Sequence, residues 1–166
     1  ADASFARQPG HVCVVMTADC LPVVLASTDG AIVGAAHAGW RGLAAGVVEA
    51  TLDAMRRRST AGTTFQAWLA PAIGAANFEV GDDVRAAFLA ADPQAAAAFT
   101  PNAQRRWQCD LYLLARQRLA RAGVDRISGG DYCTYAEEGR FFSHRRDVQH
   151  RGLAATGRMA TLIWRT

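Results

Sequence analysis

The chain contains no lysine, and all 18 of its basic residues are arginine. This absence excludes a Schiff-base lysine, the lysine of a P-loop and the catalytic lysine of a protein kinase. Arginine is well suited to hold a phosphate or carboxylate through two parallel hydrogen bonds. The arginines are scattered, without interleaved aromatic residues, so we expect no nucleic-acid partner.

Cys-x-x-Cys pairs and long apolar runs are also missing. The four cysteines stand apart, and 166 residues are enough to bury a core without disulfides. We therefore expect reduced thiols and a cytoplasmic protein. No apolar run reaches the roughly 20 residues of a transmembrane helix, and nothing resembles a signal peptide, so we expect no membrane partner.

The apolar pattern predicts a mixture of strands and helices in one domain, residues 1–166. Asp82 and Asp110 are expected to cap helices. Because the elements do not alternate strictly as βαβ units, the sequence favours an α+β layered fold. Strands are expected at 12–16, 22–26, 31–36, 64–69, 124–127 and 158–164, a hairpin turn at 27–30, helices at 43–57, 83–91 and 111–122, and a short helix or turn at 94–99.

Cys20 and His37 occur in two unusually specific settings. Cys20 belongs to Thr-Ala-Asp-Cys-Leu-Pro (17–22), and His37 opens His-Ala-Gly-Trp-Arg-Gly (37–42). Two strands joined by the turn at 27–30 can return these residues to one edge of a sheet. A thiolate and an imidazole placed together form either part of a metal site or a nucleophile–base pair. A single buried cysteine is usually structural, so the pair is what indicates function.

A third block, Phe-Phe-Ser-His-Arg-Arg-Asp (141–147), contains two adjacent arginines. Arg145 and Arg146 indicate an anion site with the aromatic pair buried beneath it; the alternative is a surface loop in which the arginines pair with Asp147. Cys133 follows Gly129-Gly130, a permissive loop that can approach a site. Cys13 and Cys109 are expected in the core.

Six blocks in order resemble the YfiH-like laccase-domain family, whose members are described as multicopper polyphenol oxidases and as purine nucleoside phosphorylases. The resemblance covers essentially the whole chain and implies an α/β/β/α sandwich related to toxin deamidases with a Cys–His site. His144 stands where the family more often has tyrosine. The blocks are 17–22, 37–43, 70–74 with 78–81, 133–134, 141–147 and 157–158.

The resemblance also implies one zinc ion held by two histidines and one cysteine. Cys20 and His37 match two of these ligands. The remaining histidine belongs to a Val-His-Gly type motif upstream of Ala1, so we expect the sequence to begin after that motif and after the family's N-terminal strands. Copper is reported for the family, but the four histidines of this chain cannot supply both a blue-copper centre and a trinuclear cluster. Zinc is therefore favoured over copper.

The leading hypothesis is a zinc-dependent enzyme that acts on purine nucleosides and phosphate. It would phosphorolyse adenosine, inosine and methylthioadenosine and deaminate adenosine. Cys20, His37 and Arg41 are the catalytic candidates. The candidates for substrate and phosphate binding are Arg145, Arg146, His144 and Cys133.

Three other hypotheses remain open. Cys20 and His37 could serve an amidohydrolase that edits peptidoglycan precursors. A copper polyphenol oxidase, or laccase, ranks below that activity. A zinc-dependent binding module would have no enzymatic activity at all. The sequence sets no oligomeric state.

Overall fold

The computed structural model describes all residues, 1–166, and contains three β-sheets and four α-helices. The strands are β1 (Ala3–Ala6), β2 (Cys13–Thr17), β3 (Leu21–Ser27), β4 (Val33–Ala38), β5 (Phe65–Leu69), β6 (Glu79–Val80), β7 (Phe99–Pro101), β8 (Trp107–Cys109), β9 (Arg126–Gly129) and β10 (Met159–Ile163). The helices are α1 (Trp40–Ala44), α2 (Val47–Arg56), α3 (Asp82–Leu89) and α4 (Leu111–Arg121). Short 3₁₀ segments span Ala75–Asn77 and Pro93–Ala98, and a π-helix spans Arg145–His150.

The central sheet has five strands in the order β1-β4-β3-β5-β9. All neighbours are antiparallel except β5 and β9. The predicted hairpin between β3 and β4 is confirmed. In its turn, the Ser27 hydroxyl accepts the Ile32 N–H at 3.0 Å and Asp29 accepts the Ala31 N–H at 2.9 Å. These short polar side chains satisfy backbone donors that the turn leaves without strand partners.

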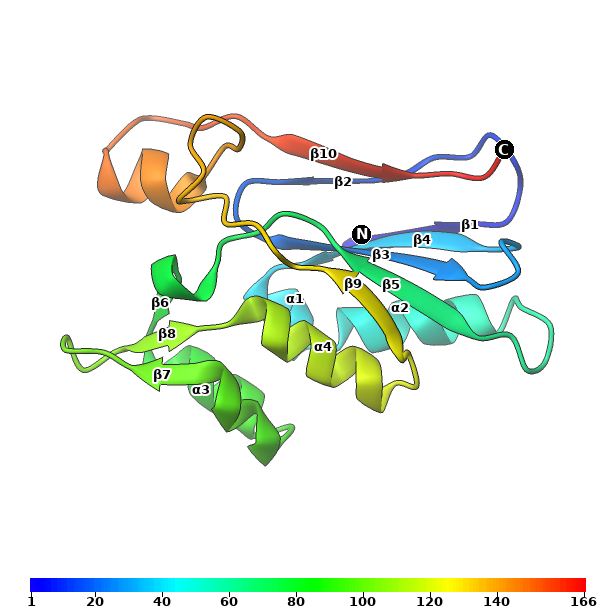
Figure 1. Cartoon of the computed structure of the whole chain (residues 1–166), viewed down its shortest axis with the longest axis horizontal. Helices are drawn as coiled ribbons and strands as arrows, with labels where there is room; N and C mark the ends of the chain where they lie inside the picture. Colours follow the sequence, from blue (N-terminus) through cyan, green and yellow to red (C-terminus); the bar gives the residue numbers. More distant parts are fainter.

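The elements form layers around the central sheet (Figure 1). Helices α1, α2 and α4 cover one face, and a two-stranded ribbon of β2 and β10 lies over the other. Most of the buried apolar side chains form one core cluster of 29 residues, and a second cluster of five lies where β2 packs on the central sheet. The predicted α+β layered sandwich is confirmed. A smaller sheet, β6-β8-β7, and α3 lie beside α4.

Two expectations about helices were wrong. The single helix expected over 43–57 is divided into α1 and α2 at Gly46, whose φ of +89° is readily adopted only by glycine. Asp82 does not cap α3: Gly81 precedes the helix, and the Asp82 carboxylate accepts the indole N–H of Trp107 at 2.7 Å. The cap predicted at Asp110 is confirmed, since its side chain accepts the Leu113 N–H at 2.9 Å.

Several elements were not predicted from the sequence. Strands β1, β6, β7 and β8 have two to four residues each, too few to show alternation of apolar and polar side chains. No secondary structure was predicted for the residues of the π-helix. No helix in the chain combines the length and the apolar character that a membrane crossing requires.

Candidate functional site

The register of the β3–β4 hairpin brings Cys20 and His37 together. Pro22 pairs with His37 and Leu21 with Ala38, so Cys20, one residue earlier, faces Gly39. A Cβ atom on residue 39 would lie 2.9 Å from the Cys20 Sγ and 3.6 Å from the His37 Nε2. The thiol and the imidazole therefore flank one small space, which exists because Gly39 has no side chain.

The other ring nitrogen of His37 faces Asp2, which was not among the predicted site residues. The His37 Nδ1 lies 4.0 Å from the Asp2 Oδ1, and the His37 backbone N–H donates to the Asp2 carbonyl at 2.7 Å. Strand β1 provides this contact because it pairs with β4 directly after Asp2. No hydrogen bond joins the two side chains at this distance, and the contact is an ion pair only when the imidazole is protonated.

Burial raises the pKa of the Cys20 thiol, the Asp19 carboxylate raises it further, and Arg158 lowers it. Cys20 is therefore a neutral thiol at neutral pH unless a cation or a base takes its proton. A soft sulfur and an imidazole nitrogen match the donors that zinc prefers. No three His, Cys, Asp or Glu side chains cluster closely enough to hold a metal ion by themselves. Cys20 and His37 thus fit two positions of a zinc ligand set.

Asp19 connects Cys20 to three other segments of the chain. Its carboxylate accepts the Thr134 hydroxyl and the Arg145 backbone N–H, both at 2.7 Å. Its carbonyl accepts the Ile73 N–H at 2.9 Å. The backbone of Asp19 has a φ of +90°, a left-handed conformation that is uncommon for residues other than glycine.

Arg145 is half-buried beside this junction. Its Nη1 donates to the Glu79 carbonyl at 3.0 Å, and its guanidinium lies 5.4 Å from the centroid of the Phe78 ring. Burial lowers the pKa of Arg145, while Asp19 and Glu79 raise it. An arginine remains charged under these conditions, so Arg145 keeps a cation with unused donors at the site.

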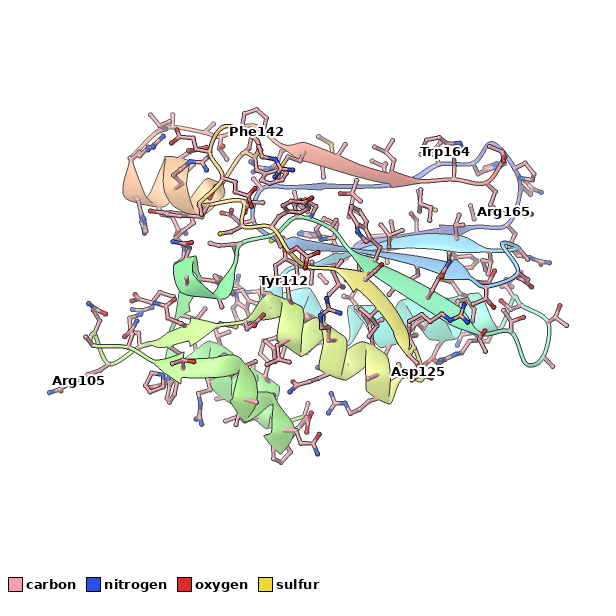
Figure 2. All side chains as sticks on the ribbon, in the orientation of Figure 1. Arg105, Tyr112, Asp125, Phe142, Trp164 and Arg165 are labelled. Carbon is pink, nitrogen blue, oxygen red and sulfur yellow. The ribbon has the colours of Figure 1, made fainter.

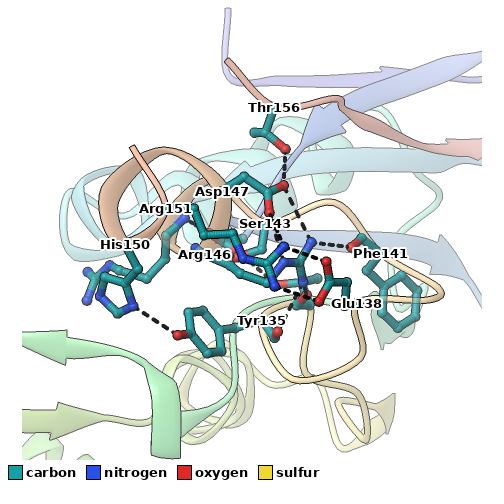
Figure 3. A network of polar contacts seen from close by, with 12 residues as sticks. Tyr135, Glu138, Phe141, Ser143, Arg146, Asp147, His150, Arg151 and Thr156 are labelled. Atoms are coloured by element: carbon teal, nitrogen blue, oxygen red, sulfur yellow. Dashed lines mark hydrogen bonds and ion pairs between the residues drawn. The ribbon is translucent and has the colours of Figure 1, made fainter. Parts of the chain in front are cut away.

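Arg146, by contrast, uses all of its side-chain donors within the protein (Figure 3). It is 6% exposed, and its Nε donates to Asp147 at 2.8 Å. Its Nη1 donates to the carbonyls of Thr134 and Tyr135, and its Nη2 to the carbonyl of Phe141 and to Asp147. In this arrangement Arg146 holds the segment 134–147 together and presents no free N–H to an anion.

The remainder of the 141–147 block differs from the expected buried aromatic pair. Phe142, which is labelled in Figure 2, is 49% exposed. Its ring lies beside Gly157, where an added Cβ would come within 2.6 Å of the ring carbon Cζ. Its burial was therefore predicted wrongly, because the carbonyls of the loop, and not the aromatic rings, surround Arg146. The alternative pairing with Asp147 is present, although it is buried and not at the surface. His144 is exposed.

The side chains of Arg41 and Cys133 form no hydrogen bond or cation–π contact with Cys20 or His37. Arg41 is exposed, with its guanidinium 4.4 Å from the centroid of the Trp40 ring. The Cys133 thiol accepts the Gly74 N–H at 3.2 Å and donates to Asn77 at 3.3 Å. Residue 134, the next along the chain, is the one that contacts Asp19. Cys133 is therefore linked to the Cys20 segment by its neighbour Thr134, which bonds to Asp19.

The two other cysteines are core residues, as predicted. Cys13 is 3% exposed and Cys109 is fully buried. Burial, with a smaller contribution from Asp110, raises the pKa of Cys109 to about 12. All four cysteines are free. Neither core thiol is accessible to a substrate, and the raised pKa keeps Cys109 protonated at neutral pH.

The sequence matches the family described as multi-copper polyphenol oxidoreductase laccase over residues 1–166. It is 52% identical over 164 residues to the purine nucleoside phosphorylase YfiH of Escherichia coli K12, and 48% identical over 165 residues to a purine nucleoside phosphorylase of Pseudomonas aeruginosa. These alignments cover 99% of this chain but only 63% and 64% of the two relatives.

Solved structures show the same similarity. A Neisseria meningitidis protein is 48% identical and superposes with a TM-score of 0.89, covering 99% of this chain and 64% of that protein. YlmD from Geobacillus stearothermophilus is 32% identical, also with a TM-score of 0.89, covering 99% of this chain and 60% of YlmD. The chain thus spans somewhat less than two thirds of these relatives.

Proposed function

We propose that this chain, which belongs to the multi-copper polyphenol oxidoreductase laccase family, carries the reaction centre of a purine nucleoside phosphorylase. The observation that carries the proposal is the placement of Cys20 and His37 around the space at Gly39, with Arg145 anchored next to Cys20 through Asp19. The relatives named as purine nucleoside phosphorylases support the same substrate class.

In phosphorolysis, an oxygen of inorganic phosphate forms a bond to the anomeric carbon of the ribose. The glycosidic bond breaks, its electron pair stays on the purine nitrogen, and that base is protonated as it leaves. Arg145 supplies the cation that holds the phosphate, since its Nε and Nη2 have no protein partner. Arg41, which is exposed, would supply a second cation for the phosphate. Cations held in place in this way offset the negative charge of the phosphate and orient its attacking oxygen.

Cys20 and His37 are proposed to hold zinc, with a further ligand from outside the pair. Bound zinc would act as a Lewis acid and would lower the pKa of a coordinated water to ~7. The backbone hydrogen bond from the His37 N–H to the Asp2 carbonyl would help to hold His37 in place. Gly39 keeps the space between the sulfur and the nitrogen open.

We further propose that the same centre acts on three purine nucleosides and deaminates adenosine. Adenosine, inosine and methylthioadenosine share a purine and a ribose, so one phosphate site beside Cys20 would serve all three. Deamination of adenosine would need an activated water at the amine-bearing ring carbon, which is the chemistry that zinc supplies. Four free cysteines are in keeping with a cytoplasmic enzyme, which we include in the proposal.

The test is release of hypoxanthine from inosine by the protein at its natural length. Release should depend on phosphate, and Cys20→Ala should abolish it while the circular dichroism spectrum stays unchanged. Cys13→Ala is the matched control, because Cys13 is a buried core thiol outside the site. Full activity of Cys20→Ala would refute the proposal.

A second candidate is an amidohydrolase that edits peptidoglycan precursors. The observation that favours it is the arrangement of Cys20 and His37 around the space at Gly39, with the Asp2 carboxylate 4.0 Å from the other side of the imidazole. This is the order of a nucleophile, a base and a carboxylate. The raised pKa of Cys20 means that His37 would have to remove its proton. Release of an amino acid from a UDP-linked muramyl substrate, without nucleoside turnover, would favour this candidate.

Copper polyphenol oxidation ranks third. The matched family is described by this activity. Multicopper chemistry, however, requires several imidazole ligands around copper. Of the four histidines, only His37 shares the space at Gly39 with Cys20; His11 and His144 are exposed, and His150 bonds to Tyr135. Phosphate-independent oxidation of a phenol, lost in Cys20→Ala, would raise its rank.

A further inference from the structure

We propose that Asp19 is a positioning residue that sets the placement of Cys20 relative to Arg145. This inference rests on the proposed function, in which Cys20 belongs to the reaction centre and Arg145 holds phosphate. Asp19 itself is buried at 9% exposure and touches neither substrate in this scheme. Its effect passes through its backbone on one side and through its carboxylate on the other.

The backbone of Asp19 directs Cys20 toward Gly39. Only two residues other than glycine have a positive φ, and of these Arg105 lies in an exposed turn whereas Asp19 is buried. A buried residue keeps such a conformation only where its surroundings fix it. Here the Asp19 carbonyl accepts the Ile73 N–H at 2.9 Å, which holds the turn immediately before Cys20.

The carboxylate of Asp19 directs Arg145. Its Oδ2 accepts the backbone N–H of Arg145, the first residue of the π-helix, at 2.7 Å. That N–H lies at a helix start, where donors have no partner within the helix. The Oδ1 accepts the hydroxyl of Thr134, which is fully buried, so the carboxylate cannot rotate freely. One residue thus fixes the position of the thiol and of the phosphate-binding arginine.

Two substitutions separate the carboxylate from the backbone conformation. Asp19→Gly removes the carboxylate, while glycine adopts a φ of +90° without strain. Asp19→Asn conserves both contacts, because its amide oxygen can accept the Arg145 N–H and its NH₂ can donate to the Thr134 hydroxyl. The asparagine variant therefore serves as the conservative rescue of the glycine variant.

Asp92→Gly is the matched control. Asp92 is also buried, at 8% exposure, and its carboxylate also has two partners: it accepts the Gln94 N–H at 2.9 Å and pairs with Arg121. These contacts lie beside the 3₁₀ segment Pro93–Ala98 and involve no residue of the proposed site. Any loss of stability common to both glycine variants is therefore not a sign of positioning.

Two measurements on the natural-length protein test the proposal. In steady-state kinetics with inosine, Asp19→Gly should raise the KM for phosphate by about tenfold or more, because a displacement of ~1 Å is enough for such losses. Asp19→Asn and Asp92→Gly should stay within about twofold of the wild type on the same measure. In nuclear magnetic resonance spectra, the Gly39 amide and His37 imidazole signals should shift in Asp19→Gly but not in Asp92→Gly.

The outcomes separate this inference from the proposed function. Wild-type KM values and unshifted Gly39 and His37 signals in Asp19→Gly would overturn the positioning role. A wild-type protein without phosphate-dependent activity would overturn the proposed function alone. In that case the spectra still decide: shifted signals support the positioning of the Cys20–His37 pair, and unshifted signals contradict it.

Discussion

Cys20 faces Gly39 across the open end of the β3–β4 hairpin, with its Sγ only 2.9 Å from where a Cβ of residue 39 would stand. Real Cβ contacts are longer than this, so a side chain at residue 39 and the observed position of the Cys20 thiol exclude each other. The same Cβ would lie 3.6 Å from the His37 Nε2. The space between the Cys20 thiol and the His37 imidazole therefore exists only because residue 39 is glycine.

The first prediction concerns Gly39→Ala. The backbone of Gly39 has φ −59° and ψ 159°, which alanine adopts readily, so the fold should persist. The added methyl should displace the Cys20 thiol and lower phosphorolysis of inosine by about 10²-fold. The control is Gly139→Ala, since a Cβ there meets nothing within 4 Å. Equal activity of both variants would contradict the role assigned to this space.

The second prediction separates the adjacent residues Arg145 and Arg146. Arg146→Met removes a 6%-exposed guanidinium from its carbonyl and carboxylate partners, and should lower the free energy of unfolding by about 3–5 kcal/mol in urea denaturation. Arg145→Met should instead raise the KM for phosphate, with a smaller loss of stability.

The exposed Arg57 provides the control for this pair of variants. Arg57→Met should change the free energy of unfolding by no more than about 0.5 kcal/mol. If Arg146→Met unfolds at the wild-type urea concentration and raises the KM for phosphate, then Arg146 belongs to the anion site after all.

The third prediction concerns stability at acid pH. The hydroxyl of Thr156 and the guanidinium of Arg146 hold the pKa of Asp147 below its ordinary value. Because the folded-state pKa is the lower one, this contribution to stability is present above the unfolded pKa of about 3.9 and is lost as the pH falls through the folded pKa. Asp147→Asn should therefore be less stable than the wild type at neutral pH, and its stability should fall less steeply below about pH 4.

Urea denaturation at a series of pH values measures this difference. Asp125→Asn is the control, because Asp125 is exposed and its side chain makes no hydrogen bond or ion pair. It should keep the acid slope of the wild type. An unchanged slope in Asp147→Asn would show that Asp147 is not the group responsible.

The fourth prediction is an order of thiol labelling. Cys109 is fully buried and its pKa is raised to about 12, whereas Cys133 is partly exposed. Iodoacetamide reacts with the thiolate, so at about pH 8 the folded protein should be alkylated at Cys133 and spared at Cys109. Peptide mass spectrometry locates the label, and the urea-unfolded protein is the control in which Cys109 should react. Labelling of folded Cys109 at the rate of Cys133 would contradict the burial of Cys109.

The local pattern of the sequence was enough for the hairpin that carries Cys20 and His37. Apolar runs of five or six residues on either side of Ser27–Gly30 predict two paired strands, and a short turn leaves few possible registers. For the same reason the helix cap at Asp110 was predicted correctly. These features depend on neighbours within a few positions of the chain.

Only the tertiary structure shows that the side chains of Arg145 and Arg146 differ in their hydrogen-bond partners. The two residues are adjacent and chemically identical, yet the carbonyls of residues 134, 135 and 141 enclose one guanidinium, while the other keeps free donors beside Phe78. Asp2 reaches His37, and Asp19 reaches Thr134 and Arg145, by the same kind of long-range contact. The sequence by itself determined which residue types could perform the chemistry and the hairpin that joins the first pair. Which arginine stays available depended on how residues 134–141 fold back around Arg146. The contact of Asp19 with Arg145 joins residues 126 positions apart in the chain, so no local pattern could predict it.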